Sequence, residues 1–406
     1  MANSIIVSQI GARHRYIIPQ VLSKKGLLCS LYTDSSSESI LGKIAKFISR
    51  CGVSVPQMNR LIRRCPNLPK SQIRTTDILA IKEMLYRIRK APLELRLEQP
   101  YLGISKKCMK WGVKSADCVY GMYFENFEFL KYAKTHNVKV VVDIYERPMT
   151  YKLISEEIRN NSEYHEYIDM ISNNDIKHNI RMKYIEDILS LADYYTIPSL
   201  FVAESLSQFR NFNKNKVKII PYASSIIPCQ YDYSPIKHRL LFVGSDPVIK
   251  GLLYCAKAAT KLKDLYPDLD FRVAGGGPDL EKIKKDETFN SLYFIGYLNK
   301  NELEQEYKSA EAFVFPTLFE GFAGSLIEAA SCGCPIITTI NAGADPNEFP
   351  ALFIREKNVD EIVSCVIKIF EDSQFRDELS LSTYNYAKKF TPEYYSESLV
   401  SFFKSI

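Results

Sequence analysis

The sequence predicts an α/β fold with two Rossmann-like, doubly wound domains that face each other across a cleft. Three observations predict it. Short β-branched runs alternate with helix-like segments through most of the chain, a pattern typical of parallel sheets covered by helices. A polar stretch at residues 222–237 divides this alternation into two series. The length of 406 residues suits two or three domains of ordinary size.

The first series opens with a βαβ unit. Residues 4–7 form a short apolar strand, and Gly11 is the turn residue. A helix then ends at Gly26, before a second strand at 27–32. A crossover of this kind makes the two strands parallel. Further strands are expected at 118–120, at 138–142, within 189–197 and at 217–221, with a helix at 124–134.

Basic helices interrupt this series. From Lys43 to Lys114 the chain holds 17 Lys and Arg against 4 Asp and Glu, a net charge of +13, and the remaining residues carry −7. Two predicted helices, near 40–50 and at 76–90, each place apolar residues on one side with basic residues at the flanks. Either helix alone is equally well explained as a surface helix packed on the core. The shared charge favours contact with an anionic membrane, through Lys43, Lys46, Arg63, Arg64, Arg87, Arg89 and Lys90.

The second series predicts a complete doubly wound domain. Ligands of open α/β sheets bind at the carboxyl ends of the strands, so functional residues are expected in the loops there. A final helix begins at Thr391-Pro392, a good pair for an N-cap and a first turn. The domain boundaries we infer are 1–220, 221–390 and 391–406. The strands expected in this series lie at 240–243, 271–274, 292–295, 312–315 and 335–338.

The composition excludes several classes of protein. The chain has no run of 18 apolar residues, so no helix is expected to span a bilayer. Residues 1–4 lack the basic region and long apolar core of a signal peptide. The ten cysteines are scattered, and the one close pair, Cys332 and Cys334, lacks a second pair for zinc. We therefore expect a cytoplasmic protein with reduced thiols.

The most informative segment is FEGFAGSLIEA, residues 319–329. It follows a predicted strand and opens a helix, so Glu320 lies in the loop and Glu328 about a turn into the helix. The backbone N–H groups of residues 323–325 are expected to point outward at the helix N-terminus, where a diphosphate binds favourably. A carboxylate beside such a site suits sugar or ribose hydroxyls because it accepts two hydrogen bonds. The alternative is a capped surface helix with two unrelated glutamates, which the combined spacing and glycines disfavour.

Two further loops are expected at the same sheet edge. Gly244-Ser245 ends the first strand of the second series, and Lys250-Gly251 begins the next helix. Lys250 can reach a phosphate there as a compact charge, although a lone solvated lysine is the more frequent case. The run at residues 275–278, Gly-Gly-Gly-Pro, follows another strand. A plain turn with Pro at the first helical position explains it, and its glycines also admit a nucleotide close to the backbone.

These residues, in this order, resemble the retaining glycosyltransferases of family 4, whose two-Rossmann architecture is called GT-B. The matched features are the Gly244 to Gly251 opening, the glycine-rich turn at 275–278, and the Glu-Gly-Phe loop with a second Glu eight residues on. The resemblance is most specific from Arg239 to Thr339. It implies that the first domain handles the acceptor and the second binds the donor. It also implies that the last helix crosses back to the first domain.

The resemblance further implies a site for a nucleotide-diphosphate sugar. Glu320 then holds the sugar hydroxyls, Glu328 the ribose and Lys250 the phosphates. Gly11 lets the first loop approach the diphosphate from the opposite domain, and the base lies near the glycine-rich turn. The implied donor-binding set is Gly11, Gly244, Ser245, Lys250, Gly275, Gly276, Tyr297, Leu298, Glu320, Gly321, Phe322, Ala323, Gly324, Ser325 and Glu328.

Two departures from the family pattern bear on catalysis. A basic residue commonly follows the strand-end glycine, whereas in this sequence that position is Ser245, which leaves Lys250 as the main phosphate cation. Many members also carry a His on the acceptor side, and the corresponding segment has none. Asp143 or Glu146 takes that role, or each is an ordinary strand-end carboxylate. His14 is a further candidate for this role. The alternative is that His14 is an ordinary surface residue at the start of a helix, which is the more frequent case.

The predicted function is transfer of a sugar from a UDP- or GDP-linked donor to a hydroxyl of a lipid-linked saccharide, with retention of configuration. The setting we expect is synthesis of bacterial surface polysaccharide, such as lipopolysaccharide, on the inner face of the cell membrane. We expect no cofactor, metal or nucleic acid: the Asp268-x-Asp270 motif precedes a strand, at the wrong end of the sheet for a donor metal.

Other functions remain open on the same sequence. One is a GT-B nucleotide-sugar epimerase or phosphorylase. The loop from Glu320 to Glu328 counts against an epimerase. A phosphorylase is disfavoured because no lysine lies in an evident cofactor-binding context. The other is a non-catalytic module that binds a membrane or a polyanion. Intact Glu320, Glu328 and Lys250 count against it, whereas Ser245 and the missing His count for it.

Overall fold

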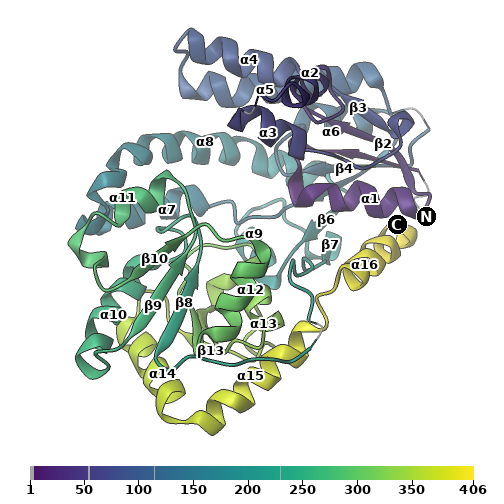
Figure 1. Cartoon of the computed structure of the whole chain (residues 1–406). Coiled ribbons are helices and arrows are strands. Elements are labelled where there is room, and N and C mark those ends of the chain that lie inside the picture. The colour runs from purple at the N-terminus through teal and green to yellow at the C-terminus, as the bar shows by residue number, and fades with distance from the viewer. Residues whose placement is uncertain (1–3, 54, 114, 229) are drawn as a thin grey trace.

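The computed structural model describes residues 4–53, 55–113, 115–228 and 230–406. Lys114, the last residue of the predicted basic block, lies outside the described residues, as do residues 1–3. The described chain forms two parallel sheets, one in each half, with helices packed around them (Figure 1). This arrangement confirms the predicted fold class of two Rossmann-like domains.

The first sheet has seven strands in the order β3-β2-β1-β4-β5-β6-β7. The crossover from β1 through α1 to β2 is parallel, as the opening βαβ pattern predicts. The reversal of strand order between β1 and β4 puts the loops after these strands on either side of a crevice, where doubly wound sheets bind ligands. The strands are β1 (Ile5–Ser8), β2 (Leu28–Thr33), β3 (Ile73–Thr75), β4 (Cys118–Met122), β5 (Lys139–Asp143), β6 (Tyr194–Ile197) and β7 (Val217–Ile219).

The second sheet has six strands in the order β10-β9-β8-β11-β12-β13. Its central strands β8, β11 and β12 are mainly buried, because helices cover both faces of the sheet there, whereas the edge strand β10 has no buried residue. The expected strands of the second series match β8 to β12 within one residue at each end, and the structure adds β13. The strands are β8 (Arg239–Val243), β9 (Asp270–Ala274), β10 (Tyr293–Gly296), β11 (Ala312–Phe315), β12 (Ile336–Thr339) and β13 (Leu352–Ile354).

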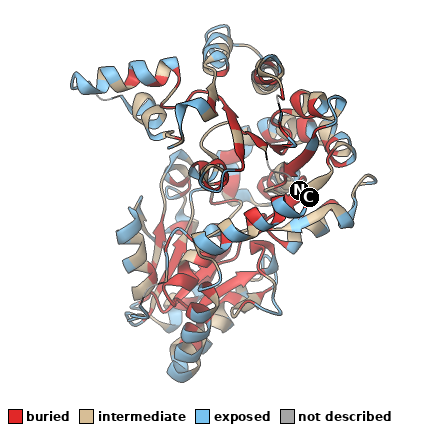
Figure 2. Ribbon diagram, turned by 90° about the vertical axis from the view of Figure 1, so that its right-hand side faces the viewer, coloured by how far each residue is buried: buried red, intermediate tan, exposed pale blue. Residues whose placement is uncertain are grey.

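Helices fill the connections of both sheets. In the first half they are α1 (Ile17–Lys24), α2 (Ile40–Arg50), α3 (Pro56–Arg63), α4 (Ile78–Ile88), α5 (Leu93–Trp111), α6 (Phe127–Thr135), α7 (Thr150–Asn160), α8 (Ile168–Leu191) and α9 (Leu200–Leu206). In the second half they are α10 (Leu252–Leu265), α11 (Pro278–Ile283), α12 (Lys300–Ser309), α13 (Gly324–Ser331), α14 (Val359–Glu371), α15 (Ser373–Ala387) and α16 (Pro392–Ser405). Figure 2 shows that buried residues gather in the sheets and exposed ones on the outer helices.

Two segments cross between the halves. The region from α7 to a short 3₁₀ helix at Ser162–Tyr167 packs into the core of the second half, where Ile158 and Tyr167 are buried with α10 and α11. The Tyr167 hydroxyl donates a 2.5 Å hydrogen bond to the Asp279 carbonyl. In return, α16 packs with α1 on the first sheet, where Phe403 is fully buried (Figure 1). The apolar side of α7 predicts that the helix is packed, but not which of the two halves it packs on.

The expected strand entry at 189–197 is partly wrong. Residues up to Leu191 complete the 24-residue helix α8, and only Tyr194–Ile197 forms a strand. The apolar run continues across the helix end, which hides the boundary because both elements are buried there. None of the described helices is both long and apolar enough to cross a membrane.

Candidate active site

The Glu-Gly-Phe loop lies between β11 and α13 at the carboxyl edge of the second sheet. Glu320 forms an ion pair with Lys250, which reaches it from the loop after β8. Both side chains are largely shielded, with 16% of Glu320 and 22% of Lys250 exposed. The Lys250 ammonium also lies 5.3 Å from the centre of the Phe315 ring. The sequence analysis placed both residues in the site but did not foresee that they pair.

Burial sets the protonation of Lys250. It lowers the pKa of Lys250 to about 8, because the ammonium loses water, and the nearby Asp246 carboxylate opposes the shift. The contacting Glu320 carboxylate opposes it further, since an opposite charge in contact stabilises the ammonium. Without a donor, the Lys250 ammonium and the Glu320 carboxylate therefore pair with each other. A diphosphate and a sugar hydroxyl can each replace one of these partners.

The N-terminus of α13 supplies two free donors rather than three. The Ala323 N–H donates a 2.9 Å hydrogen bond to the Ala342 carbonyl, so it does not point outward as predicted. No side chain caps the helix. Within the described part of the chain, the N–H groups of Gly324 and Ser325 make no hydrogen bond. These two groups, with the positive end of the helix dipole, suit a phosphate.

Glu328 lies in the second turn of α13, behind this helix end. Its carboxylate accepts a 2.6 Å hydrogen bond from the Ser225 hydroxyl and a 3.4 Å hydrogen bond from the Tyr307 hydroxyl. Burial raises the pKa of Glu328, and these two hydrogen bonds oppose the rise. The charges of Arg15 and Lys300 act in the same opposing direction, so Arg15 of the first half lies within electrostatic reach of Glu328.

The loops after β8 and β9 lie against each other through their glycines. A Cβ on Gly275 would lie 2.1 Å from the Gly244 carbonyl oxygen, so only glycine fits there. A Cβ on Gly276 would lie 3.3 Å from the Cβ of Tyr297. Tyr297 itself is 84% exposed and offers an open aromatic face. The residues predicted to hold the base are therefore brought together, with Leu298 packed on the core beside them.

The Gly11 loop forms the opposing wall, and carboxylates that the sequence analysis missed hold it. The Gly11 N–H donates to Asp34 at 2.8 Å, and the Ile10 N–H donates to Glu125 at 2.9 Å. Glu125 also binds Arg13, and Asp34 binds Arg64 at 3.1 Å. Asp34 and Glu125 each follow a strand of the first sheet at its carboxyl end, which is the one sequence signal that marks them.

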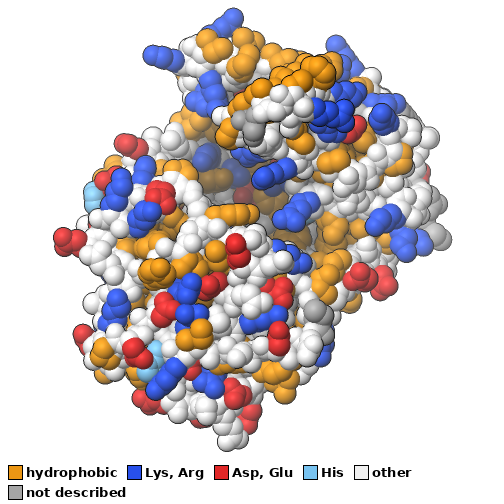
Figure 3. Space-filling view, in the orientation of Figure 1, with side chains coloured by type: hydrophobic (Ala, Val, Ile, Leu, Met, Phe, Trp, Pro, Cys, Tyr) orange, Lys and Arg blue, Asp and Glu red, His pale blue; other side chains and the backbone are white. Residues whose placement is uncertain are grey.

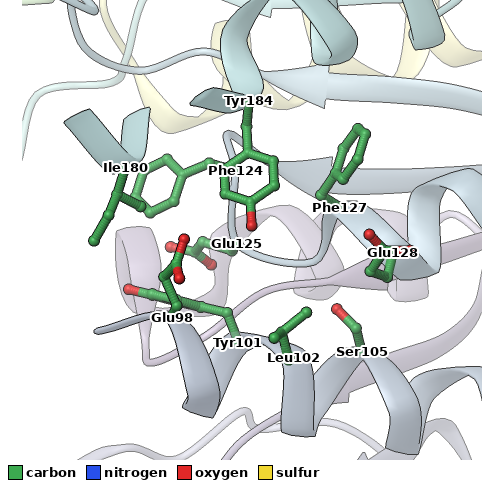
Figure 4. Close-up of a pocket in the computed structure, with 10 residues that line it drawn as sticks. All are labelled: Glu98, Tyr101, Leu102, Ser105, Phe124, Glu125, Phe127, Glu128, Ile180 and Tyr184. Atoms are coloured by element: carbon green, nitrogen blue, oxygen red, sulfur yellow. The ribbon is translucent and has the colours of Figure 1, made fainter. Parts of the chain in front are cut away.

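A small cavity behind this wall is drawn in Figure 4. Its side chains come from α5, α6, α8 and the loop after β4. Of the acidic groups there, Glu98 pairs with Lys183 and Glu125 with Arg13. Glu125 thus links this cavity to the Gly11 loop.

The acceptor-side candidates lie where the two halves meet. A Cβ on Gly321 would lie 2.1 Å from the Tyr145 carbonyl oxygen, and the Ser199 hydroxyl donates a 2.6 Å hydrogen bond to the Gly321 carbonyl. The Glu-Gly-Phe loop therefore docks directly on the first domain. Figure 3 shows the hollow between the halves, with Lys and Arg side chains on its walls.

Of these candidates, Asp143 is buried and does not face the open cleft. Asp143 is 3% exposed and lies against the hydroxyls of Tyr120 and Thr196, and burial raises its pKa to about 7. Glu146 is held by Arg181 in an ion pair. His14 is exposed, and its ring lies tilted against Tyr222 with ring centres 4.2 Å apart. Partial loss of water, together with the charge of Arg13, lowers the pKa of His14 to about 4.

The predicted membrane-contact residues fall into two groups. Lys43, Arg63, Arg87, Arg89 and Lys90 are exposed. The other two are paired: Lys46 binds Glu38 at 2.9 Å, and Arg64, 27% exposed, binds Asp34.

The carboxylates of the Asp-x-Asp motif have protein partners. Asp268 accepts a 2.7 Å hydrogen bond from His238, and Asp270, at the start of β9, binds Arg239 at 2.8 Å. Among the described residues, no group of three or more His, Cys, Asp or Glu is placed to hold a metal ion.

Comparisons with known proteins show which proteins are similar to this one in sequence and fold. Residues 237–372 match the family described as Glycosyl transferases group 1. The solved structure of a sucrose-phosphate synthase from Thermosynechococcus elongatus superposes with a TM-score of 0.69 at 14% identity, and it covers 99% of this chain and 98% of its own. The two chains therefore share their overall fold along nearly their whole length. The fold is GT-B.

Two curated relatives are named as glycosyltransferases. An uncharacterised glycosyltransferase from Methanocaldococcus jannaschii is 25% identical over 57% of this chain and 70% of its own length. The UDP-Gal:α-D-GlcNAc-diphosphoundecaprenol α-1,3-galactosyltransferase of Escherichia coli is 28% identical over 30% of this chain and 34% of its own length. The family match and these relatives support a glycosyltransferase of the GT-B type.

Proposed function

We propose that this chain transfers a sugar from a nucleotide-diphosphate sugar to a hydroxyl of a lipid-linked saccharide, with retention of configuration. The observation that carries the proposal is the pairing of Lys250 with Glu320 beside the free N-terminus of α13. Donor binding replaces that pair: the diphosphate takes Lys250 and the N–H groups of Gly324 and Ser325, and a sugar hydroxyl takes Glu320. Glu328 accepts hydrogen bonds from the ribose.

Departure of the nucleoside diphosphate is the step that these groups promote. Negative charge grows on the leaving phosphate, and Lys250 with the end of α13 stabilises it electrostatically. We propose that this occurs without a metal ion. The contact of Gly321 with Tyr145 closes the two domains over the sugar, which excludes water and orients the acceptor hydroxyl.

An apolar face on the basic helices supports a lipid-linked acceptor. On α2 the buried side is made of Gly42 and Ala45, and a Cβ on Gly42 would lie 2.0 Å from the Ser36 carbonyl. Because α2 packs through these small residues, its large apolar side chains face solvent. The exposed apolar side chains of α2 and α4 are Ile40, Ile44, Phe47, Ile78, Ile81, Met84, Leu85 and Ile88.

Charge complements this face. The exposed residues Lys43, Arg87, Arg89 and Lys90 flank it on the same helices. Figure 3 shows hydrophobic side chains over the upper helices with Lys and Arg at their margins. A basic helix with an exposed apolar face suits the surface of an anionic membrane. We propose that this face holds the enzyme on the inner side of the cell membrane, where surface polysaccharide is assembled on lipid. The Escherichia coli relative, by its name, acts on a lipid-linked acceptor.

The test has two stages. A thermal-shift panel of UDP, GDP and ADP with their sugars identifies the donor, because a ligand that binds only the folded state raises the melting temperature. Nucleotide release is then measured with that donor, with and without lipid-linked saccharides. A transferase releases nucleotide slowly until acceptor is added, whereas an epimerase converts the donor alone. If no donor and acceptor give release while anionic liposomes still bind, the chain is a binding module and the proposal is wrong.

A further inference from the structure

An arginine-lined cavity opens beside the Gly11 loop, outside the residues assigned to the donor. Its volume is about 490 Å³. Its walls hold four arginines and no carboxylate, and every one of these residues belongs to the first domain. The lining residues are Ala12, Arg15, Tyr16, Arg60, Arg63, Arg64, Cys65 and Asn67.

Most of the charge in this cavity has no counter-charge. Arg64 binds Asp34, which lies behind it. Within the described residues, Arg15, Arg60 and Arg63 form no ion pair. Guanidinium groups that converge on one cavity repel each other unless an anion lies between them. Their planar donors match the oxygens of phosphate, often two at a time.

The backbone brings one of these arginines into the cavity at a conformational cost. His14, Arg15 and Tyr16 have φ angles of 46°, 51° and 61°, so three consecutive residues other than glycine are left-handed. Backbone strain of this kind gathers at ligand sites. Here it presents Arg15 to the cavity on one side and to Glu328 of the donor domain on the other.

The position of the cavity indicates which phosphate it serves. On one side the Arg64 guanidinium lies 4.0 Å from where a Cβ on Gly11 would stand, so the cavity adjoins the cleft. On the other side α3, which carries Arg60 and Arg63, packs against α2 with its exposed apolar face. The donor diphosphate already has Lys250 and α13. A ligand that reaches from the apolar face to the cleft passes this cavity.

We propose that the cavity binds the phosphate or diphosphate ester of the acceptor, and so selects phosphorylated acceptors over neutral saccharides. This rests on the transferase function proposed above and assigns Arg63 and Arg64 to the substrate rather than to the membrane surface. The acceptor phosphate, held between Arg15, Arg60 and Arg63, fixes the distance from the lipid to the reacting hydroxyl.

Calorimetry on the full chain gives the first test. Inorganic pyrophosphate is titrated into the Lys250→Ala chain, which lacks the donor phosphate cation, and into the same chain carrying Arg60→Gln and Arg63→Gln. The matched control carries Arg210→Gln and Lys218→Gln, two exposed residues far from the cavity lining. We expect the cavity variant to lose about 100-fold in affinity, since two charge-assisted hydrogen-bond donors are removed, and the control to lose none. Equal affinity in both overturns the proposal.

Kinetics and vesicles separate the remaining possibilities. With the native Lys250 present, the Arg60→Gln, Arg63→Gln variant should raise KM for a soluble saccharide diphosphate at least tenfold. Its KM for the matching phosphate-free glycoside should be unchanged. Loss of binding to phosphatidylglycerol vesicles with an unchanged pyrophosphate affinity would assign the arginines to lipid headgroups and overturn the proposal. If no acceptor supports transfer, the proposed function fails, while calorimetry still decides whether the cavity binds phosphate.

Discussion

The donor domain and the basic helices of the first domain use apolar residues in opposite ways. Helix α10 of the donor domain buries eight of its residues, seven of which are completely inaccessible. Helix α2 buries only Gly42 and Ala45, and it leaves Phe47 67% exposed. Ionic groups follow the same division, since the donor domain pairs Lys250 with Glu320, whereas Arg60 and Arg63 of the first domain remain unpaired among the described residues.

The first region is built to hold its loops in one shape, and the second exposes a surface to solvent. In the donor domain, backbone atoms approach so closely that glycine is required at Gly275 and Gly321. Such positions fix the loops to which the proposed function assigns the nucleotide sugar. The basic helices carry no such constraint on their outer side, where charge and apolar area face solvent. We therefore expect substitutions in the donor domain to affect chemistry or folding, and those on the basic helices to affect what the enzyme binds.

The largest effect is expected from Lys250→Ala. It removes the ammonium that binds Glu320 and that, in the proposed function, binds the donor diphosphate. Loss of one preorganised charge at a leaving group reduces the rate by about 100- to 1,000-fold. Steady-state kcat/KM for the donor measures this loss. The exposed Lys285, in the same domain, provides the control as Lys285→Ala. A decrease below threefold for Lys250→Ala contradicts the role of this lysine.

A smaller effect is expected from Gly321→Ala, which tests the contact between the two domains. The added methyl group would lie 2.1 Å from the Tyr145 carbonyl, so the domains must move apart. Displacement of about 1 Å at a reacting centre costs on the order of 100-fold in rate. We expect kcat to fall by that order and small-angle scattering to report a larger radius of gyration. Gly324→Ala, whose methyl group meets nothing within 4 Å, should leave the radius unchanged. An unaltered radius for Gly321→Ala would show that the loop yields instead.

The sequence predicted the donor domain well because its signals are local. A strand, a glycine turn and a helix start follow one another within a few residues around Gly244 and Gly275, and the Glu320 loop has the same order. The Lys250 to Glu320 pair joins residues 70 positions apart and leaves no local trace. The hydrogen bond that the Ala323 N–H donates to the Ala342 carbonyl likewise leaves no local trace, because Ala342 lies in a loop that follows another strand.

The first domain was harder to predict, for a physical reason. Asp34 and Glu125 look like ordinary strand-end acids until the fold brings Gly11 and Arg13 against them. The apolar residues of α2 have the spacing of a core-facing helix. Their exposure depends on Gly42, which lets α2 pack through its small side instead.

The pH dependence of donor binding should separate the two charges of the site. Burial lowers the pKa of Lys250 to about 8 in the chain that contains Glu320. In the wild type, nucleoside diphosphate affinity should therefore fall about tenfold per pH unit above roughly pH 8, as the ammonium is lost. In Glu320→Gln the decline should begin at lower pH, because the carboxylate that stabilises the ammonium is gone. Calorimetry from pH 6.5 to 10 measures both. Lys250→Arg, which stays charged, should bind without this decline, and a persistent decline would assign the titration to another group.

The smallest effect on stability is expected on the apolar face of the basic helices. Ile44 and Ile88 are 49% and 69% exposed, so Ile44→Gln and Ile88→Gln remove little buried area. We expect the free energy of unfolding in urea to change by less than about 0.5 kcal/mol for each. Leu262→Ala, at a fully buried position of α10, should cost about 2–5 kcal/mol. The two glutamine variants should nevertheless weaken binding to anionic liposomes, since apolar area and charge act together there. A destabilisation comparable to that of Leu262→Ala would mean that this face belongs to the core, and the contrast between the two regions would then be wrong.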